Sequence, residues 1–140
     1  RYKTVGRRSR VVKTGYCTLV DDCYNANPTS DRAAIDSLAS LSGRHVCILG
    51  DMLEMGGNAP ELHRSVGEYA AAHGVDLVIT QGELAKYIAE GAGTAGAHYA
   101  DRASLLAALP ELLHEGDVVL VKASHGAHFE EISEAVKQLS

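Results

Sequence analysis

Long hydrophobic runs and aromatic residues are scarce in this sequence. The chain has 140 residues, with no tryptophan and a single phenylalanine. No apolar run approaches the roughly 20 residues that a membrane-spanning helix needs, and the first residues lack a signal-peptide pattern, so membrane insertion is not expected. Hydrophobic residues nevertheless make up 46% of the chain, which excludes a disordered protein and predicts one domain with a core of its own.

Cysteine is also scarce, and its spacing argues against a zinc site. The three cysteines, Cys17, Cys23 and Cys47, show neither Cys-x-x-Cys nor Cys/His ligand spacing. An odd number of cysteines without close pairing is typical of free thiols in a reducing compartment. We therefore expect a cytoplasmic protein without a structural metal.

Acidic residues outnumber basic ones, but the basic residues gather at the start of the chain. The net charge is −5, yet residues 1–13 hold six basic residues and no acid, which leaves 7 basic against 18 acidic residues, a net −11, in the remainder. A body this acidic is not expected to bind nucleic acid. We interpret the basic arm as a connector to another domain, with a nucleic-acid-binding tail as the alternative.

No phosphate-binding loop of the GxxxxGK[ST] type is present, so we expect that the chain cannot hold a triphosphate unaided. Residues 91–96 do match G-x-G-x-x-G. The dinucleotide fingerprint needs a strand before this motif and a helix after it, whereas here the pattern predicts the reverse order. We predict that residues 91–96 form a loop from a helix to a strand.

Apolar segments and helical patterns alternate along the chain. Strands are expected at 16–22, 44–49, 76–80, 97–100 and 118–122, and residues 1–14 hold at most one edge strand. Helices are expected at about 29–42, 60–73 and 83–91, after Asp101, and at 126–139, with Pro110 kinking or splitting the fourth. This alternation predicts an α/β, Rossmann-like fold, a mostly parallel doubly wound sheet with helices on both faces.

Polar residues directly follow three of the expected strands. Because the carboxyl ends of parallel strands share one edge of the sheet, where ligands bind in open α/β folds, the three turns should face a common crevice. The first turn also opens a helix, and a helix N-terminus suits phosphate and ribose hydroxyls. The polar residues are Asp22, Tyr24, Asn25 and Asn27 in the first turn, Asp51, Met52 and Glu54 in the second, and Lys122, Ser124 and His125 in the third.

The same residue types have structural explanations that the sequence leaves open. Asp and Asn fill turns and cap helices in many proteins, and Ser124 is well placed to cap the last helix. Lys122 has the alternative of an edge lysine that buries its stem and keeps its charge in water. We interpret His63 as an inert surface side chain. A Ser/His/Asp triad can be drawn from Ser124, His125 and Asp51, but nothing marks an activated nucleophile.

Three stretches together resemble one family of enzymes. Residues 21–35, DDCYNANPTSDRAAI, resemble the DDxYNANPxSxxAAL signature of the UDP-N-acetylmuramoyl-tripeptide–D-alanyl-D-alanine ligases, a branch of the Mur ligases. Residues 49–67 contain LGDMLEMG and LHRSVG, which are similar to LGDMxELG and LHxxVG of the family. Residues 116–125, GDVVLVKASH, are similar to its GDxVLVKGSR. The resemblance covers about residues 15 to 138.

The resemblance implies the third domain of a three-domain ligase. In the family, the first domain holds the UDP-sugar, the central domain carries the phosphate-binding loop and Mg²⁺, and the third domain closes over ATP. Residues 1–14 would be the connector from the central domain, and residues 15–140 the C-terminal domain. The chain also begins with Arg1 rather than Met, so we expect a fragment or a processed piece.

The reaction that the resemblance implies is the ATP-dependent addition of D-alanyl-D-alanine to UDP-N-acetylmuramoyl-tripeptide, a cytoplasmic step of peptidoglycan precursor synthesis. The partners of the chain would be its own N-terminal and central domains and these two substrates. The third domain would orient reactants and exclude water. No catalytic residue is expected in this piece, and it should be inactive alone.

By the same resemblance, the first turn faces the nucleotide, with Asp22 at the ATP ribose, and the second and third turns line the dipeptide side. Three positions depart from the family pattern: Asp31 stands where Met is usual, Ala123 replaces Gly, and His125 replaces Arg. The loss of this Arg removes a bidentate carboxylate donor, because His holds its charge only weakly at neutral pH.

Two other interpretations stay open. The chain could be the equivalent domain of another Mur ligase or of a folylpolyglutamate synthetase, although those carry histidine in the first turn. It could also be a Rossmann-like module without enzymatic function that binds a nucleotide or a partner. A phosphate-binding loop upstream of residue 1 would favour either ligase.

Overall fold

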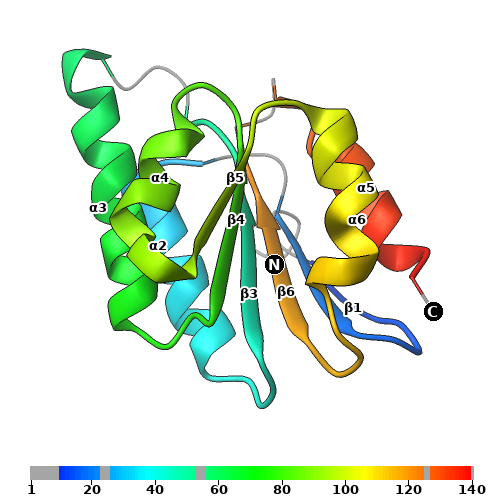
Figure 1. The fold of residues 1–140 in the computed structure, drawn as a ribbon. Helices are drawn as coiled ribbons and strands as arrows, with labels where there is room; N and C mark the ends of the chain where they lie inside the picture. Colours follow the sequence, from blue (N-terminus) through cyan, green and yellow to red (C-terminus); the bar gives the residue numbers. More distant parts are fainter. Residues whose placement is uncertain (1–9, 23–25, 53–55, 125–126, 140) are drawn as a thin grey trace, which may run out of the picture.

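The structure is a computed structural model, and it describes residues 10–22, 26–52, 56–124 and 127–139. Its centre is one six-stranded sheet in the order β1-β2-β6-β3-β4-β5 (Figure 1). β1 pairs antiparallel with β2 at one border of the sheet, and the other four pairings are parallel. The strands are β1 (Arg10–Lys13), β2 (Thr18–Asp22), β3 (His45–Leu49), β4 (Leu77–Gln81), β5 (Gly96–Tyr99) and β6 (Val118–Lys122).

Helices cover both faces of this sheet. In Figure 1, α2, α3 and α4 lie on one side of the strands, and α5 and α6 lie on the other. The predicted α/β, doubly wound, mostly parallel architecture is therefore confirmed, and the edge strand expected within residues 1–14 is β1. The helices are α2 (Pro28–Ala39), α3 (Ala59–Ala72), α4 (Ala85–Ala92), α5 (Arg102–Leu112) and α6 (Glu130–Lys137), with short 3₁₀ turns η1 (Gly56–Asn58) and η2 (Gly93–Ala95).

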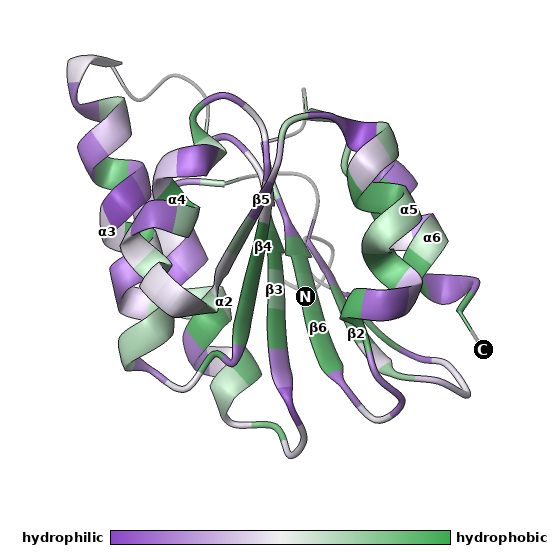
Figure 2. Cartoon of the chain, viewed as in Figure 1, coloured by the Kyte–Doolittle hydropathy of each residue, from purple (hydrophilic) through white to green (hydrophobic). Residues whose placement is uncertain are grey.

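The central strands β3, β4 and β6 are largely apolar because each faces two cores. In β6, Val118 and Leu120 pack with the helices α2 to α4, whereas Val119 and Val121 pack with α5 and α6. Side chains alternate between the faces of a sheet, so a strand covered on both sides needs a continuous apolar run. Figure 2 shows this distribution, with hydrophobic colouring on the central strands and hydrophilic colouring concentrated on the helices and turns.

Several predictions about the ends and continuity of the elements were wrong. The helix expected at 29–42 ends at Ala39, which leaves Leu41 outside it with 38% of its surface exposed. Pro110 does not split α5: it lies two residues before the last helical residue, so the missing N–H affects only the final turn. The strand expected from residue 16 begins at Thr18, and the last helix is shorter than predicted.

The glycine-rich stretch at 91–96 connects a helix to a strand, as predicted. α4 ends at Ala92, η2 follows, and β5 begins at Gly96. A dinucleotide fingerprint needs the opposite order of elements, so this match has no nucleotide-binding meaning.

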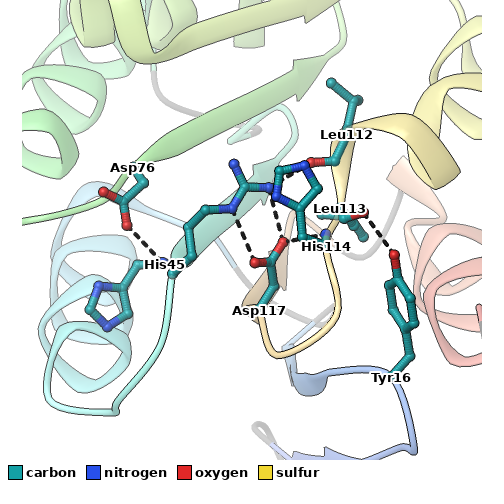
Figure 3. A network of polar contacts seen from close by, with 8 residues as sticks. Tyr16, His45, Asp76, Leu112, Leu113, His114 and Asp117 are labelled. Carbon is teal, nitrogen blue, oxygen red and sulfur yellow. Dashed lines mark hydrogen bonds and ion pairs between the residues drawn. The ribbon is translucent and has the colours of Figure 1, made fainter.

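One edge of the sheet, at which the strands begin, is closed by a hydrogen-bonded network (Figure 3). The buried Asp117 carboxylate accepts from the Arg44 guanidinium at 3.0 Å through both oxygens and from the backbone N–H of His114 at 2.7 Å. Arg44 also donates to the Leu112 carbonyl (2.6 Å), and the Tyr16 hydroxyl donates to the next carbonyl (3.0 Å). Both oxygens of this buried acid are therefore paired, which indicates a structural role for the edge.

Candidate functional site

The opposite edge, which we call the carboxyl edge, gathers the three polar turns. Asp22 at the end of β2 pairs in register with Lys122 of β6, and Lys122 pairs with Leu49 of β3. The Gly50 N–H donates to the Lys122 carbonyl (3.0 Å), and the Ser124 N–H donates to the Asp51 carbonyl (3.2 Å). The prediction that the turns after these three strands share one edge is therefore confirmed.

Lys122 lies at the centre of the carboxyl edge and is almost completely buried. Its ammonium Nζ lies 2.9 Å from Asp22 Oδ2 and 3.9 Å from Asp31 Oδ1, and 2% of its side chain is exposed. β6 lies between β2 and β3, so Lys122 is not on an edge strand from which its ammonium could reach water. The alternative of a lysine that keeps its charge in water is thus wrong, and the charge is balanced by carboxylates instead.

The two carboxylates around Lys122 are incompletely paired. Oδ1 of Asp22 and both oxygens of Asp31 are buried and have no hydrogen-bond partner within the described part of the chain. Burial raises the pKa of Asp31 to about 7, with the Asp22 charge also raising it and Lys122 and Arg32 lowering it. Buried polar atoms are usually satisfied, so unpaired acceptors mark a place where a ligand or water completes the bonding.

The remainder of the first turn caps α2. The Asn27 side chain accepts from the Ser30 N–H (2.8 Å), and the Ser30 hydroxyl accepts from the Asn27 N–H (3.2 Å), which forms a capping box. Asn27 is therefore the N-cap of α2, and Pro28 is its first helical residue. Tyr24 and Asn25 lie outside the described residues, so their predicted place in the nucleotide site is not tested.

The second turn is held by its own side chains. Asp51 Oδ1 accepts from the backbone N–H groups of Leu84 and Ala85 at 3.0 and 2.8 Å, so this carboxylate caps the start of α4. It also lies against Gly82, whose φ of +133° and lack of Cβ leave the carboxylate room. The Met52 side chain is fully buried in the core. Glu54 lies outside the described residues.

His63 is buried rather than exposed, which corrects the sequence-based interpretation. Its Nδ1 lies 2.7 Å from the Ala59 carbonyl, and its Nε2 accepts from the Met52 N–H (2.8 Å). Because Nε2 accepts, the proton must reside on Nδ1, and burial lowers the pKa of the ring. His63 therefore acts as a neutral brace that ties the second turn to α3.

The third turn continues from Lys122 towards α6. Ser124 is half-buried, and its carbonyl accepts from the Ala127 N–H (2.9 Å). His125 lies outside the described residues, so the Ser/His/Asp alternative is not tested. Among the dipeptide-side residues expected from the sequence, the structure thus brings Asp51, Lys122 and Ser124 together at the carboxyl edge.

Arg102 supports the third turn and was missed by the sequence analysis. Its guanidinium donates to the carbonyls of Ala127 (2.8 Å) and His128 (3.1 Å) and to the Gln81 carboxamide (2.9 Å). It also packs over the Phe129 ring, 5.0 Å from the ring centre. Its backbone partners lie 25 and 26 residues away, so no local pattern could have revealed these contacts.

Replacement of Arg102 by Met should therefore loosen the third turn. We expect Arg102→Met to lower the free energy of unfolding by about 1–2 kcal/mol, because two carbonyls lose a charged donor. Urea unfolding of the chain measures this loss. Arg64→Met is the control, since Arg64 forms an exposed ion pair with Glu90 and should change stability by less than about 0.5 kcal/mol. Equal losses in both variants would contradict a bracing role for Arg102.

Neither a metal site nor a membrane span is found in the described ranges. No group of three or more His, Cys, Asp or Glu residues in 10–22, 26–52, 56–124 and 127–139 could hold a metal ion. Over the same ranges, no helix is long and apolar enough to cross a membrane. Cys17 and Cys47 are free thiols, as expected, while Cys23 lies outside these ranges.

Comparison with known proteins identifies one family. The sequence profile described as "Mur ligase, glutamate ligase domain" matches residues 6–125. The chain is 38% identical over 138 residues to UDP-N-acetylmuramoyl-tripeptide–D-alanyl-D-alanine ligase of Bacillus subtilis and 39% identical over 122 residues to the enzyme of that name from Escherichia coli. The matches cover 93% and 86% of this chain but only 30% and 27% of the two relatives.

Solved structures point to the same relatives. A crystal structure of MurF ligase from Thermotoga maritima in complex with ADP superposes on 98% of this chain with a TM-score of 0.84 and 28% sequence identity. The superposition covers 32% of that protein. The chain therefore spans about a third of the proteins that it matches.

Proposed function

Because this chain belongs to the Mur ligase family through its glutamate ligase domain, we propose that it is the C-terminal lid of an ATP-dependent ligase. This enzyme joins D-alanyl-D-alanine to UDP-N-acetylmuramoyl-tripeptide in the synthesis of peptidoglycan precursors. The relatives that carry this name cover nearly all of the chain, which supports the assignment over another Mur ligase or a folylpolyglutamate synthetase. The work of the lid is to hold ATP and the dipeptide in place, and it is inactive alone.

The observation that carries this proposal is the bonding at the carboxyl edge. Asp22 is oriented by Lys122 through one oxygen, and its other oxygen has no partner within the described residues. A fixed carboxylate with a free acceptor suits a ribose hydroxyl, which donates a hydrogen bond. We assign Asp22, Tyr24, Asn25 and Asn27 to the nucleotide, with Asp22 at the ribose.

The second and third turns line the dipeptide side in this proposal. Asp51 and the buried Met52 act by shaping the turn, since the Asp51 carboxylate caps α4 and the Met52 side chain fills the core. Ser124 is half-buried beside them. Lys122, Glu54 and His125 complete the proposed dipeptide side.

Closure of the lid is what the domain contributes to the reaction. ATP phosphorylates the tripeptide carboxylate, the dipeptide amine attacks the acyl phosphate, and phosphate leaves. The turns of this domain orient the nucleotide and the amine and exclude water, which accelerates a two-substrate reaction without a nucleophile. No described residue of the chain is assigned a covalent role.

ATP and Mg²⁺ are proposed as cofactors, held mainly by the central domain. The unpaired Asp22 oxygen fits a ribose hydroxyl, whereas the described residues hold no cluster that fits a metal ion. In this proposal the ion is held by the central domain, and no step here is routed through it. The partners are the N-terminal and central domains and the two substrates, and the place of action is the cytoplasm.

Removal of the Asp22 charge should weaken ATP binding in the full-length ligase. We expect Asp22→Asn to raise the KM for ATP at least about tenfold, with a smaller effect on the KM for the dipeptide, because the ribose hydroxyl then donates to a neutral carboxamide instead of a carboxylate. Steady-state kinetics with each substrate varied in turn measure both values. The control is Asp21→Asn, since Asp21 accepts from Ser133 on the α6 side of β2. An unchanged KM for ATP in Asp22→Asn would remove Asp22 from the nucleotide site.

A further inference from the structure

The proposed function leaves one buried acid unused. Asp31 lies in the first turn of α2, none of its surface is exposed, and both of its carboxylate oxygens lack hydrogen-bond partners in the described part of the chain. Burying a carboxylate costs free energy unless it is paired, so the presence of Asp31 at this buried position needs an explanation. The Lys122 ammonium lies 3.9 Å from Asp31 Oδ1.

Two carboxylates share this one ammonium. Asp22 approaches Lys122 from β2 at 2.9 Å, and Asp31 approaches from α2 at 3.9 Å. With all three groups ionised, the cluster carries a net charge of −1, and with Asp31 protonated it is neutral. The charge of Asp31 therefore changes the electrostatic potential at Asp22, because an ionised Asp31 offsets part of the attraction of the ammonium.

Among the described residues, three charged groups and one thiol interact with Asp31. Lys122 faces it from β6, Asp22 from β2 and Arg32 from its own helix, and the fully buried Cys47 thiol of β3 lies close enough for Asp31 to raise its pKa further. α3 also packs on α2, but there the Tyr69 hydroxyl donates to Asp36, not to Asp31. Burial raises the pKa of Asp31 to about 7, so both protonation states are populated near neutral pH.

We infer that Asp31 is a positioning residue for the nucleotide, which shares the Lys122 ammonium with Asp22 and so sets how strongly Asp22 accepts from the ribose. The inference rests on the proposed function, because it needs Asp22 at the ribose. When Asp31 is ionised, the ammonium is shared between two carboxylates. Asp22 is then neutralised less completely and accepts more strongly from the ribose hydroxyl. When Asp31 is protonated, Lys122 neutralises Asp22 alone, and the hydroxyl is bound less tightly.

The pH dependence of the KM for ATP tests this inference in the full-length ligase. The ratio of KM at pH 6 to KM at pH 8 should be roughly three- to tenfold larger in the wild type than in Asp31→Asn, the range of coupling between contacting charges. Asp31→Met, with the residue usual in the family pattern, should behave like Asp31→Asn. Asp36→Asn, on the exposed side of the same helix, should keep the wild-type profile.

A nucleotide without ribose hydroxyls distinguishes a hydrogen bond between Asp22 and the ribose from an electrostatic effect of Asp31 on the nucleotide as a whole. With 2′,3′-dideoxy-ATP, which cannot donate to Asp22, the wild type and Asp31→Asn should show the same pH dependence. A difference that persists with the dideoxy nucleotide would overturn the inference, as would identical profiles of wild type and Asp31→Asn with ATP.

Nuclear magnetic resonance of the 140-residue chain provides a readout that does not need catalysis. The ¹⁵N signal of the Lys122 ammonium should shift with the same midpoint as the ¹³C signal of the Asp31 carboxyl, and the Lys122 shift should vanish in Asp31→Asn. A Lys122 signal that stays constant from pH 5 to 9 would overturn the inference. If Asp22→Asn leaves the KM for ATP unchanged, the proposed function fails instead, whatever the ammonium signal does.

Discussion

Lys122→Met should be among the most destabilising single substitutions in this chain. We expect the free energy of unfolding to fall by about 3–5 kcal/mol at pH 8, because two buried carboxylates then lose their cation. Met fills a volume similar to that of the lysine stem, so the loss reports charge rather than a cavity. Urea unfolding of the 140-residue chain measures it.

The loss in Lys122→Met should depend on pH in a defined direction. The pKa of Asp31 is raised in the folded state from its usual 3.8 to about 7. A raised carboxyl pKa means that the folded state holds the proton more tightly, so the stability that Asp31 contributes is complete below about pH 4 and lost as the pH rises through 7. The Lys122 charge reduces this loss of stability by pairing with the ionised Asp31. Its removal should therefore lower the free energy of unfolding most above pH 7 and progressively less towards pH 5.

A surface lysine provides the matched control for this experiment. Lys137→Met breaks a pair with Glu134 whose acidic partner is largely exposed, and it should change stability by less than about 0.5 kcal/mol at either pH. If Lys122→Met were as stable as the wild type at pH 8, the buried pairing of Lys122 would be refuted.

Gly67→Val should separate two helices that the fold packs at backbone contact. A Cβ on Gly67 of α3 would overlap the Ile88 carbonyl of α4 and lie 2.8 Å from the Ala92 backbone nitrogen. Backbone atoms cannot rotate away as side chains do, so α4 must shift along its whole length. We expect a loss of about 3 kcal/mol in the free energy of unfolding, at the upper end for overpacked cores.

The control for the helix contact is a glycine with open space around it. A Cβ on Gly57 would meet nothing within 4 Å, so Gly57→Val should change stability by less than about 0.5 kcal/mol. Thermal and urea unfolding of both variants compare the two sites directly. Equal stabilities of Gly67→Val and the wild type would show that α3 and α4 do not pack as closely as described.

The architecture could be predicted from the sequence because its signals are regular. Apolar strands that alternate with helical patterns leave a parallel sheet as the simple solution, and parallel strands that end in polar turns must present them at one edge. The pairing of β2 with β6, which sets Asp22 beside Lys122, could not be predicted, because the pattern does not fix the strand order. Helix ends were less predictable, because Leu41 continues the helical spacing although the chain has already left the helix.

The roles of individual polar residues could be predicted only in part. Asp31 and His63 carry a periodic signal, since Asp31 precedes the buried Ile35 by four residues and His63 precedes the buried Val66 by three. A helical face predicts burial for both, but side-chain polarity argued for the surface. The Asp51 cap on α4 and the Arg102 brace could not be predicted, because their partners come from elements far along the chain.

The orientation of the carboxyl edge towards ATP is the central claim, and a structure of the intact ligase with an ATP analogue and D-alanyl-D-alanine tests it most directly. We predict that Asp22 Oδ1 accepts a hydrogen bond from a ribose hydroxyl and that the turns after β2, β3 and β6 face the two ligands. A structure in which the Arg44–Asp117 edge faces the nucleotide, with Asp22 turned away from it, would contradict the claim.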